Sequence, residues 1–273
     1  MTRSGGDNLA LLAAMGYRLF ATSGPTPAYC STSMPNIRVK RQSFTIPVDG
    51  DSVPAILQIP SSDDPLPGVL LLHGFSSRKE RMADSIGRAL AARRVASLAI
   101  DLPLHGARDA GFEGISFQNP MAVIQNWRLA VREAHAGLEY LSAHAAVDRG
   151  RIGIAGYSLG SYLATTVAAD NALAKVITLA AGGDLPAQMP FAPLVRSVVD
   201  PLREIRKLTG RPLLMINGRF DRTILPDQAR SLFDAASEPK ELRWYEAGHW
   251  PPQSAIDSVA EWLAATLAST PGG

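Results

Sequence analysis

Residues 152–160 read Ile-Gly-Ile-Ala-Gly-Tyr-Ser-Leu-Gly, an apolar run followed by a serine that lies between two glycines. The first four residues are typical of a strand buried on both faces, and an apolar helix is predicted directly after Ser158. A serine at such a junction occupies a strained turn, where a side chain at Gly156 or Gly160 would clash with the neighbouring strand or helix. The pattern makes Ser158 a candidate nucleophile; the alternative is a glycine-rich turn with a bystander serine.

Strands and helices alternate on both sides of this stretch. An Asp49-Gly50 turn joins the first two predicted strands and favours an antiparallel hairpin. The alternation predicts an α/β fold with a mostly parallel sheet of about eight strands, antiparallel at the N-terminal edge, and helices on both faces. The predicted strands are 39–46, 53–59, 69–72, 95–100, 152–155, 176–179, 212–216 and 242–245, and the main predicted helices are 80–92, 121–143, 226–236 and 254–267.

One domain accounts for most of the chain. Residues 1–37 are rich in Ser, Thr, Gly and Pro and are expected to form an N-terminal extension, whereas 38–273 form a single α/β domain. The segment 183–209 is longer than a simple connection. It is either a small lid over a pocket or a longer crossover, and the sequence leaves both open.

Composition limits the partners that we expect. The 273 residues are 46% apolar and carry a net charge of +2, which is ordinary for a globular protein and does not indicate a nucleic-acid partner. No apolar stretch reaches the length of a membrane span, and the lone Cys30 excludes an intrachain disulfide. We therefore expect a cytoplasmic protein. The sequence does not indicate its oligomeric state.

A serine nucleophile needs a base, and His249 is the best placed of the five histidines. It follows the last predicted strand, and catalytic loops of an open parallel sheet lie at the carboxyl ends of strands. His73 ends a buried strand in the position of an oxyanion-loop residue, and His105 has a predicted packing role in its loop. The remaining two, His135 and His144, are interpreted as ordinary helix residues.

The base needs an acid that orients its second ring nitrogen. Asp221 follows the strand 212–216 and gives the order serine, aspartate, histidine along the chain. Asp184 is the alternative acid, and Asp227 is interpreted as a charge in the first turn of a helix.

The oxyanion hole requires two N–H donors, which we assign to the backbone of Phe75 and Leu159. Apolar residues near these positions are candidates for a substrate pocket, although each could instead belong to the core. The pocket candidates are Phe75, Trp250, Phe191 and Ile224, with Phe117 as a further loop residue.

Five motifs together resemble the α/β-hydrolase superfamily, and within it the dienelactone-hydrolase-like and prolyl-oligopeptidase-related esterases. They are Leu72-His73-Gly74-Phe75, Asp101 with His105-Gly106-Ala107-Arg108, Gly156-Tyr157-Ser158-Leu159-Gly160, Gly218-Arg219-Phe220-Asp221 with Pro226, and Gly248-His249. The resemblance covers about 38–267. It implies a nucleophile at Ser158, an acid at Asp221, a base at His249, and oxyanion donors at Phe75 and Leu159. Dienelactone hydrolases use a cysteine nucleophile, so Ser158 favours ordinary ester cleavage.

The expected activity is hydrolysis of short to medium acyl esters through an acyl-enzyme, with a small-molecule ester as substrate and no metal or cofactor. Because His249 must be neutral, we expect activity to fall below about pH 6 to 7. Two alternatives remain: the same fold acting on amides or peptides, and a non-catalytic ligand-binding member of the superfamily.

Overall fold

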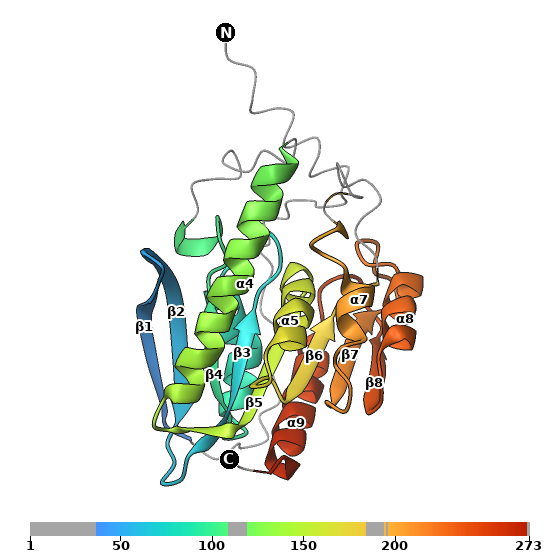
Figure 1. The fold of residues 1–273 in the computed structure, drawn as a ribbon. Coiled ribbons are helices and arrows are strands. Elements are labelled where there is room, and N and C mark those ends of the chain that lie inside the picture. Colours follow the sequence, from blue (N-terminus) through green and yellow to red (C-terminus); the bar gives the residue numbers. More distant parts are fainter. Residues whose placement is uncertain (1–36, 109–118, 184–193, 195, 272–273) are drawn as a thin grey trace, which may run out of the picture.

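The structure is a computed structural model that describes residues 37–108, 119–183, 194 and 196–271. Eight strands form one sheet in the order β1-β2-β4-β3-β5-β6-β7-β8 (Figure 1). The strands are β1 (Val39–Val48), β2 (Asp51–Pro60), β3 (Leu66–Leu72), β4 (Ala96–Ile100), β5 (Val147–Tyr157), β6 (Val176–Ala180), β7 (Leu213–Gly218) and β8 (Lys240–Tyr245).

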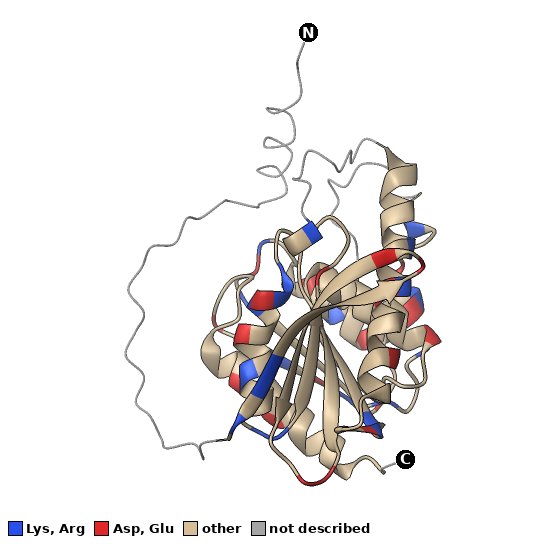
Figure 2. Cartoon of the chain, turned by 90° about the vertical axis from the view of Figure 1, so that its left-hand side faces the viewer, with Lys and Arg blue, Asp and Glu red and all other residues tan. Residues whose placement is uncertain are grey.

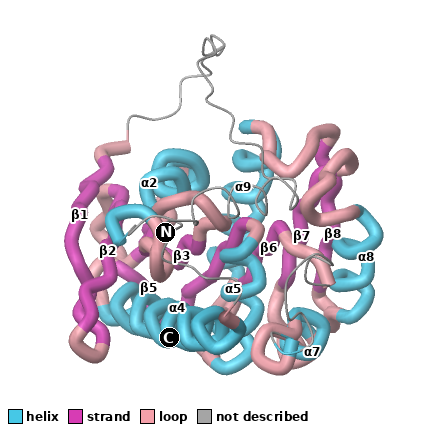
Figure 3. The backbone as a smooth tube through the Cα atoms, turned by 90° about the horizontal axis from the view of Figure 1, so that it is seen from above, coloured by secondary structure: helices cyan, strands magenta, loops and turns pink. Residues whose placement is uncertain are grey.

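Helices cover both faces of the sheet (Figure 3). One face carries α2 (Lys79–Met82), the π-helical turn η1 (Ala83–Gly87), α3 (Arg88–Ala91) and α9 (Gln253–Ser269). The other face carries α4 (Pro120–Ala143), α5 (Leu159–Asp170), α7 (Pro201–Ile205) and α8 (Pro226–Ala235). A short 3-10 turn, η2 (Gly106–Arg108), lies in the loop after β4.

The predicted fold class is confirmed. β1 pairs antiparallel with β2, and β2 pairs antiparallel with β4, whereas all the other neighbours in the sheet are parallel. The hairpin turn has positive φ at both Asp49 and Gly50, the backbone of a tight two-residue turn. The predicted start of α4 is also confirmed, because Asn119 Oδ1 accepts the N–H groups of Met121 and Ala122 ahead of the apolar stripe.

The predicted helix 80–92 is interrupted by the π-helical turn η1. Such a turn inserts one extra residue, and the apolar spacing on either side of it still matches a helix. Sequence periodicity therefore predicted the helix without its irregular turn.

Part of the segment 183–209 packs on the domain. It contains α7, whose Ile205 is fully buried against the core. Residues 184–193 and 195 lie outside the described residues, as do Asp184, Phe191, Phe117, Cys30 and all of the predicted extension except residue 37.

In Figure 2, the Lys and Arg positions (blue) and the Asp and Glu positions (red) are interspersed along the chain around the twisted sheet. Among the described residues, no helix combines the length and the apolar composition needed to cross a membrane.

The sheet brings four loops to one edge. β5 lies between β3 and β6, with Leu72 opposite Gly156 and Tyr157 opposite Ala180, so the strands end at the same level. β7 and β8 are also parallel neighbours. Because carboxyl ends of parallel strands meet at one edge, the loops after β3, β5, β7 and β8 converge there.

Candidate active site

Ser158 occupies a sharp turn between β5 and α5. Its φ of 54° and ψ of −117° lie outside the regions that residues other than glycine ordinarily adopt. A Cβ at Gly156 would lie 2.3 Å from the carbonyl oxygen of Gly160, and a Cβ at Gly160 would lie 2.1 Å from that of Leu72. Both distances are far below van der Waals contact. The two glycines therefore allow α5 to begin close to β3 and β5.

A second serine, Ser161, fixes this turn. Its hydroxyl donates to the Gly156 carbonyl (2.6 Å) and accepts the N–H of Ala180 (2.9 Å). The N–H of Ser158 donates to the Ala180 carbonyl (3.1 Å). These bonds tie the turn to β6 and hold Ser158 at the N-terminus of α5, where free N–H groups and the helix dipole favour negative charge. Sequence analysis did not assign a role to Ser161.

His249 and Asp221 are brought together by the loops after β8 and β7. His249 Nδ1 lies 2.8 Å from Asp221 Oδ2, the distance of a hydrogen bond from the ring N–H to the carboxylate. Both side chains are largely buried, with exposed fractions of 13% for the histidine and 3% for the aspartate. Such a bond orients the imidazole and leaves Nε2 as the nitrogen that can act on a substrate or a nucleophile.

The other oxygen of Asp221 is committed to the backbone. Oδ1 accepts the N–H groups of Thr223 (2.8 Å) and Ile224 (3.0 Å). These bonds fix the rotation of the carboxylate, so that Oδ2 is the oxygen directed at His249. The local sequence after β7 thus positions the Asp221 carboxylate without help from a distant element.

Two tyrosines hold the backbone of His249. The hydroxyls of Tyr157 (2.9 Å) and Tyr245 (3.1 Å) both donate to the His249 carbonyl oxygen. The ring of Tyr157 also packs against the imidazole, with centroids 5.2 Å apart. Burial, helped by the charge of Asp221, raises the pKa of Tyr245 above its ordinary value, so that it remains a donor. Because Tyr157 adjoins Ser158, this contact links the turn at Ser158 to the loop that carries His249.

The loop after β3 lies against the nucleophile turn. A Cβ on Gly74 would be only 3.2 Å from Cβ of Ser158. This close approach places the backbone of 73–75 beside the serine, where the sequence predicted an oxyanion loop. The Phe75 ring is half-buried and meets His105 edge-on, with centroids 5.4 Å apart.

His73 supports the loop after β3 through hydrogen bonds within the core. Its Nε2 accepts the N–H of Leu102 (3.1 Å), so the proton lies on Nδ1, which donates to the Gly74 carbonyl (2.8 Å). Burial lowers the pKa of His73 to about 4, with a smaller contribution from the nearby His105. The ring is therefore neutral at physiological pH and has a supporting role.

A buried ion pair organises the adjacent loop after β4. Asp101 Oδ2 accepts from Lys79 Nζ (2.7 Å) and from the N–H of Ala107 (2.9 Å), and Oδ1 accepts the Lys79 N–H (2.8 Å). Asp101 is completely buried. His105 is buried in the same loop, and its Nδ1 lies 2.7 Å from the Pro103 carbonyl, which agrees with its predicted packing role.

Of the predicted pocket residues, the structure describes Phe75, Trp250 and Ile224. Ile224 is buried, and one of its methyl groups would lie 2.9 Å from a Cβ at Gly182, so its side chain belongs to the core. Its backbone N–H donates to Asp221. Leu159 is half-buried and packs against the core, while its N–H belongs to the first turn of α5.

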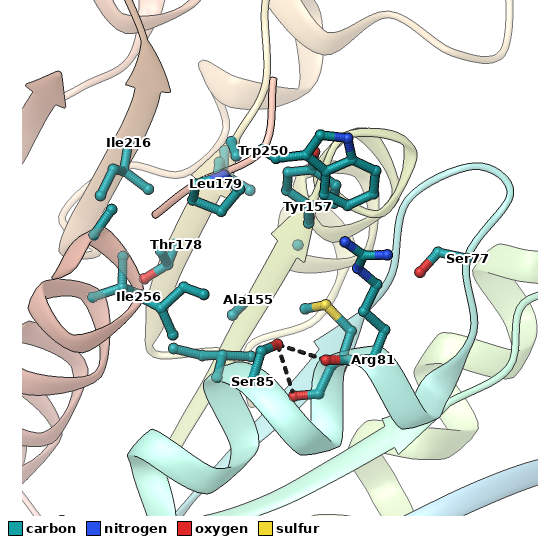
Figure 4. A pocket seen from close by; sticks show the side chains of 17 residues that line it. Ser77, Arg81, Ser85, Ala155, Tyr157, Thr178, Leu179, Ile216, Trp250 and Ile256 are labelled. Atoms are coloured by element: carbon teal, nitrogen blue, oxygen red, sulfur yellow. Dashed lines mark hydrogen bonds between the residues drawn. The ribbon is translucent and has the colours of Figure 1, made fainter. Parts of the chain in front are cut away.

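Trp250 is half exposed and lies between two other side chains. Its ring stacks on Tyr157 with centroids 5.3 Å apart, and the Arg81 guanidinium lies 3.9 Å from its centroid (Figure 4). It thereby lines a cavity on the face of the sheet covered by α2 and α9. Sequence analysis had no signal for the contact with Arg81, which is distant in the chain.

Comparisons with known proteins agree with this architecture. A model described as the alpha/beta hydrolase family matches residues 69–268. No curated protein sequence matches the chain.

Three solved structures illustrate the fold similarity. A cold-adapted esterase from an Arctic intertidal metagenomic library has a TM-score of 0.68 and 20% identity, covering 88% of this chain and 99% of its own. Acetyl xylan esterase 1 from Thermoanaerobacterium sp. has a TM-score of 0.64 and 18% identity, covering 86% and 89%. A 2,6-dihydroxy-pseudo-oxynicotine hydrolase has a TM-score of 0.63 and 17% identity, covering 84% and 68%. At such identities the similarity defines a fold and leaves the substrate open.

The sheet order, with its antiparallel edge and helices on both faces, and the family model that spans most of the domain agree with each other. The chain belongs to the alpha/beta hydrolase family.

Proposed function

We propose that this protein is a carboxylesterase that hydrolyses short to medium acyl esters, with Ser158 as nucleophile, His249 as base and Asp221 as the orienting acid. The observation that carries the proposal is the 2.8 Å contact between His249 Nδ1 and Asp221 Oδ2 at the sheet edge where Ser158 occupies its strained turn. A nucleophile, a base and an orienting group are the parts that acyl transfer needs.

The proposed reaction has two steps. Ser158 Oγ attacks the ester carbonyl carbon as its proton passes to His249 Nε2, and the N–H groups of Phe75 and Leu159 stabilise the oxyanion. The tetrahedral intermediate collapses, and the alcohol leaves with the proton from His249. Water then attacks the acyl-enzyme, giving its proton to His249, and the acid is released while Ser158 regains its hydrogen.

The hydrogen-bond network supports these roles. The backbone N–H groups on Asp221 Oδ1 and the tyrosine hydroxyls on the His249 carbonyl hold the acid and the base in place. A base held in position before the substrate arrives loses less entropy in the reaction. The same arrangement also serves amide cleavage, so the ester preference rests on the esterases among structures of the same fold.

Hydrolysis of p-nitrophenyl acetate, butyrate and octanoate tests the proposal. We expect the wild type to cleave the short esters and Ser158→Ala to lose at least about 10³-fold in kcat/KM. Ser269→Ala, which changes an exposed serine at the end of α9, is the matched control and should retain full activity. An inactive wild type would favour amide substrates or a binding protein. Activity that survives in Ser158→Ala would refute the assigned nucleophile.

A further inference from the structure

A cavity of about 200 Å³ lies on the face of the sheet covered by α2, η1 and α9, beneath the carboxyl ends of β5, β6 and β7. Figure 4 shows the small side chains of Ala155 and Thr178 facing the same space as Ile256. Small residues on the strands leave room that larger ones would fill. Most of the other lining residues are apolar and include Met82, Ile86, Ile216, Ala255 and Val259, whereas Ser77, Arg81 and Ser85 are polar.

Thr178 gives this cavity one polar group with unused bonding capacity. Its side chain is only 4% exposed, and no described residue forms a hydrogen bond with its Oγ1. The neighbouring Ser85 differs, because its hydroxyl donates to the Arg81 carbonyl (2.6 Å). Buried hydroxyls nearly always form a hydrogen bond, so the Thr178 hydroxyl, which forms none with a described residue, indicates that a hydrogen-bond partner is missing.

A single water is a poor candidate for that partner. A buried water is held by two to four polar groups, whereas this cavity is lined mainly by apolar side chains. Apolar cavities of about 150 Å³ accommodate benzene in other proteins, so a space of about 200 Å³ admits one six-membered ring with a small substituent. The hydroxyl of such a ring could both donate to and accept from Thr178.

The walls connect this cavity to the candidate active site. Trp250 and Tyr157 stack at its mouth under the Arg81 guanidinium, and they adjoin His249 and Ser158 in the chain. The π-helical turn η1 forms part of another wall through Ser85 and Ile86. π-helical turns are rare, and many occur at functional sites.

We propose that this cavity is a binding site for a small monocyclic phenol, with the ring between the sheet and α9 and the hydroxyl paired with Thr178 Oγ1. The cavity adjoins the candidate active site through Tyr157 and Trp250, and the proposal does not depend on the proposed esterase activity. Trp250 forms the mouth, so occupancy alters the environment of its indole.

Calorimetric titration of the wild-type protein tests the proposal. The probes are 4-methylphenol and toluene, which differ by one hydroxyl. We expect saturable binding of 4-methylphenol with one site per chain. Adding Thr178→Val, which keeps the shape of the side chain, should weaken 4-methylphenol about threefold to tenfold and leave toluene unchanged.

Two further variants locate the site. Ala255→Leu projects extra carbons into the cavity from α9 and should abolish binding of both probes. Thr166→Val removes a hydroxyl on α5, across the sheet, and should leave both affinities unchanged. Circular dichroism checks that each variant is folded, and Thr178→Val decides the matter if Ala255→Leu does not fold. The proposal is overturned if 4-methylphenol does not bind, or if its affinity is the same with and without Thr178→Val.

Discussion

His73 should make the stability of this protein fall as the pH is lowered from about 6.5 to 4. The ring is fully buried, and its pKa in the folded protein is about 4, against an ordinary value of 6.5. Between these two values the unfolded chain binds a proton that the folded protein does not. Acid therefore favours unfolding, and the contribution is fully present above pH 6.5 and lost as the pH approaches 4.

The magnitude follows from the two pKa values. Between about pH 7.5 and about pH 4.5, the unfolded state gains roughly 2.5 kcal/mol relative to the folded state from this one ring. His73→Gln removes the titration. It also disturbs the bonds to Gly74 and Leu102, which should cost about 1 to 3 kcal/mol at every pH.

Urea denaturation followed by the fluorescence of the four tryptophans measures the free energy of unfolding of both proteins. Carboxylates and the other histidines titrate in both, so the difference between wild type and His73→Gln isolates the one ring. We expect that difference to shrink by roughly 2.5 kcal/mol between about pH 7.5 and about pH 4.5. A difference that is independent of pH would refute a buried, neutral His73.

Three other changes test the support around the site. Gly160→Ala should lower the stability by about 3 kcal/mol or more, measured by thermal unfolding, because its Cβ would lie 2.1 Å from the Leu72 carbonyl; a normal Tm would contradict this. Tyr245→Phe should lower kcat/KM for p-nitrophenyl butyrate about threefold to tenfold by releasing the His249 carbonyl, and unchanged kinetics would exclude a positioning role. Asp101→Asn should cost about 1.5 to 3 kcal/mol in urea denaturation, because buried Lys79 loses one of its two carboxylate partners and keeps only Glu80, whereas a loss below about 1 kcal/mol would mean that the pair is solvated.

The sequence predicted the features that depend on neighbouring residues. The positions of most strands and helices followed from apolar periodicity, whereas the order of the strands in the sheet was not predicted. Ser158, Asp221 and His249 could be selected because each follows a predicted strand, and the ends of parallel strands share one edge. Of the two glycines that flank Ser158, Gly156 could be interpreted for the same reason, since its Cβ would meet the first turn of α5. The Cβ of Gly160 would instead meet Leu72 on β3, which is distant in the chain.

Contacts between distant segments could not be predicted in this way. Tyr157 and Tyr245 donate to the same backbone carbonyl, and a backbone acceptor leaves no signature in the sequence. The position of the Trp250 ring depends on Arg81, which lies far away in the chain. Ile224 was predicted as a pocket residue because it lies in the loop after β7. Its backbone N–H donates to Asp221, and its side chain is buried in the core.

Covalent labelling by a fluorophosphonate tests the assigned nucleophile most directly. Trypsin should release residues 152–175, which contain both Ser158 and Ser161, so fragmentation of that peptide must locate the adduct. We predict one adduct on Ser158 in the wild type and none in Ser158→Ala, because the hydroxyl of Ser161 is committed to holding the turn. Labelling at another residue, or an unlabelled wild type, would contradict the assignment of Ser158 as the nucleophile.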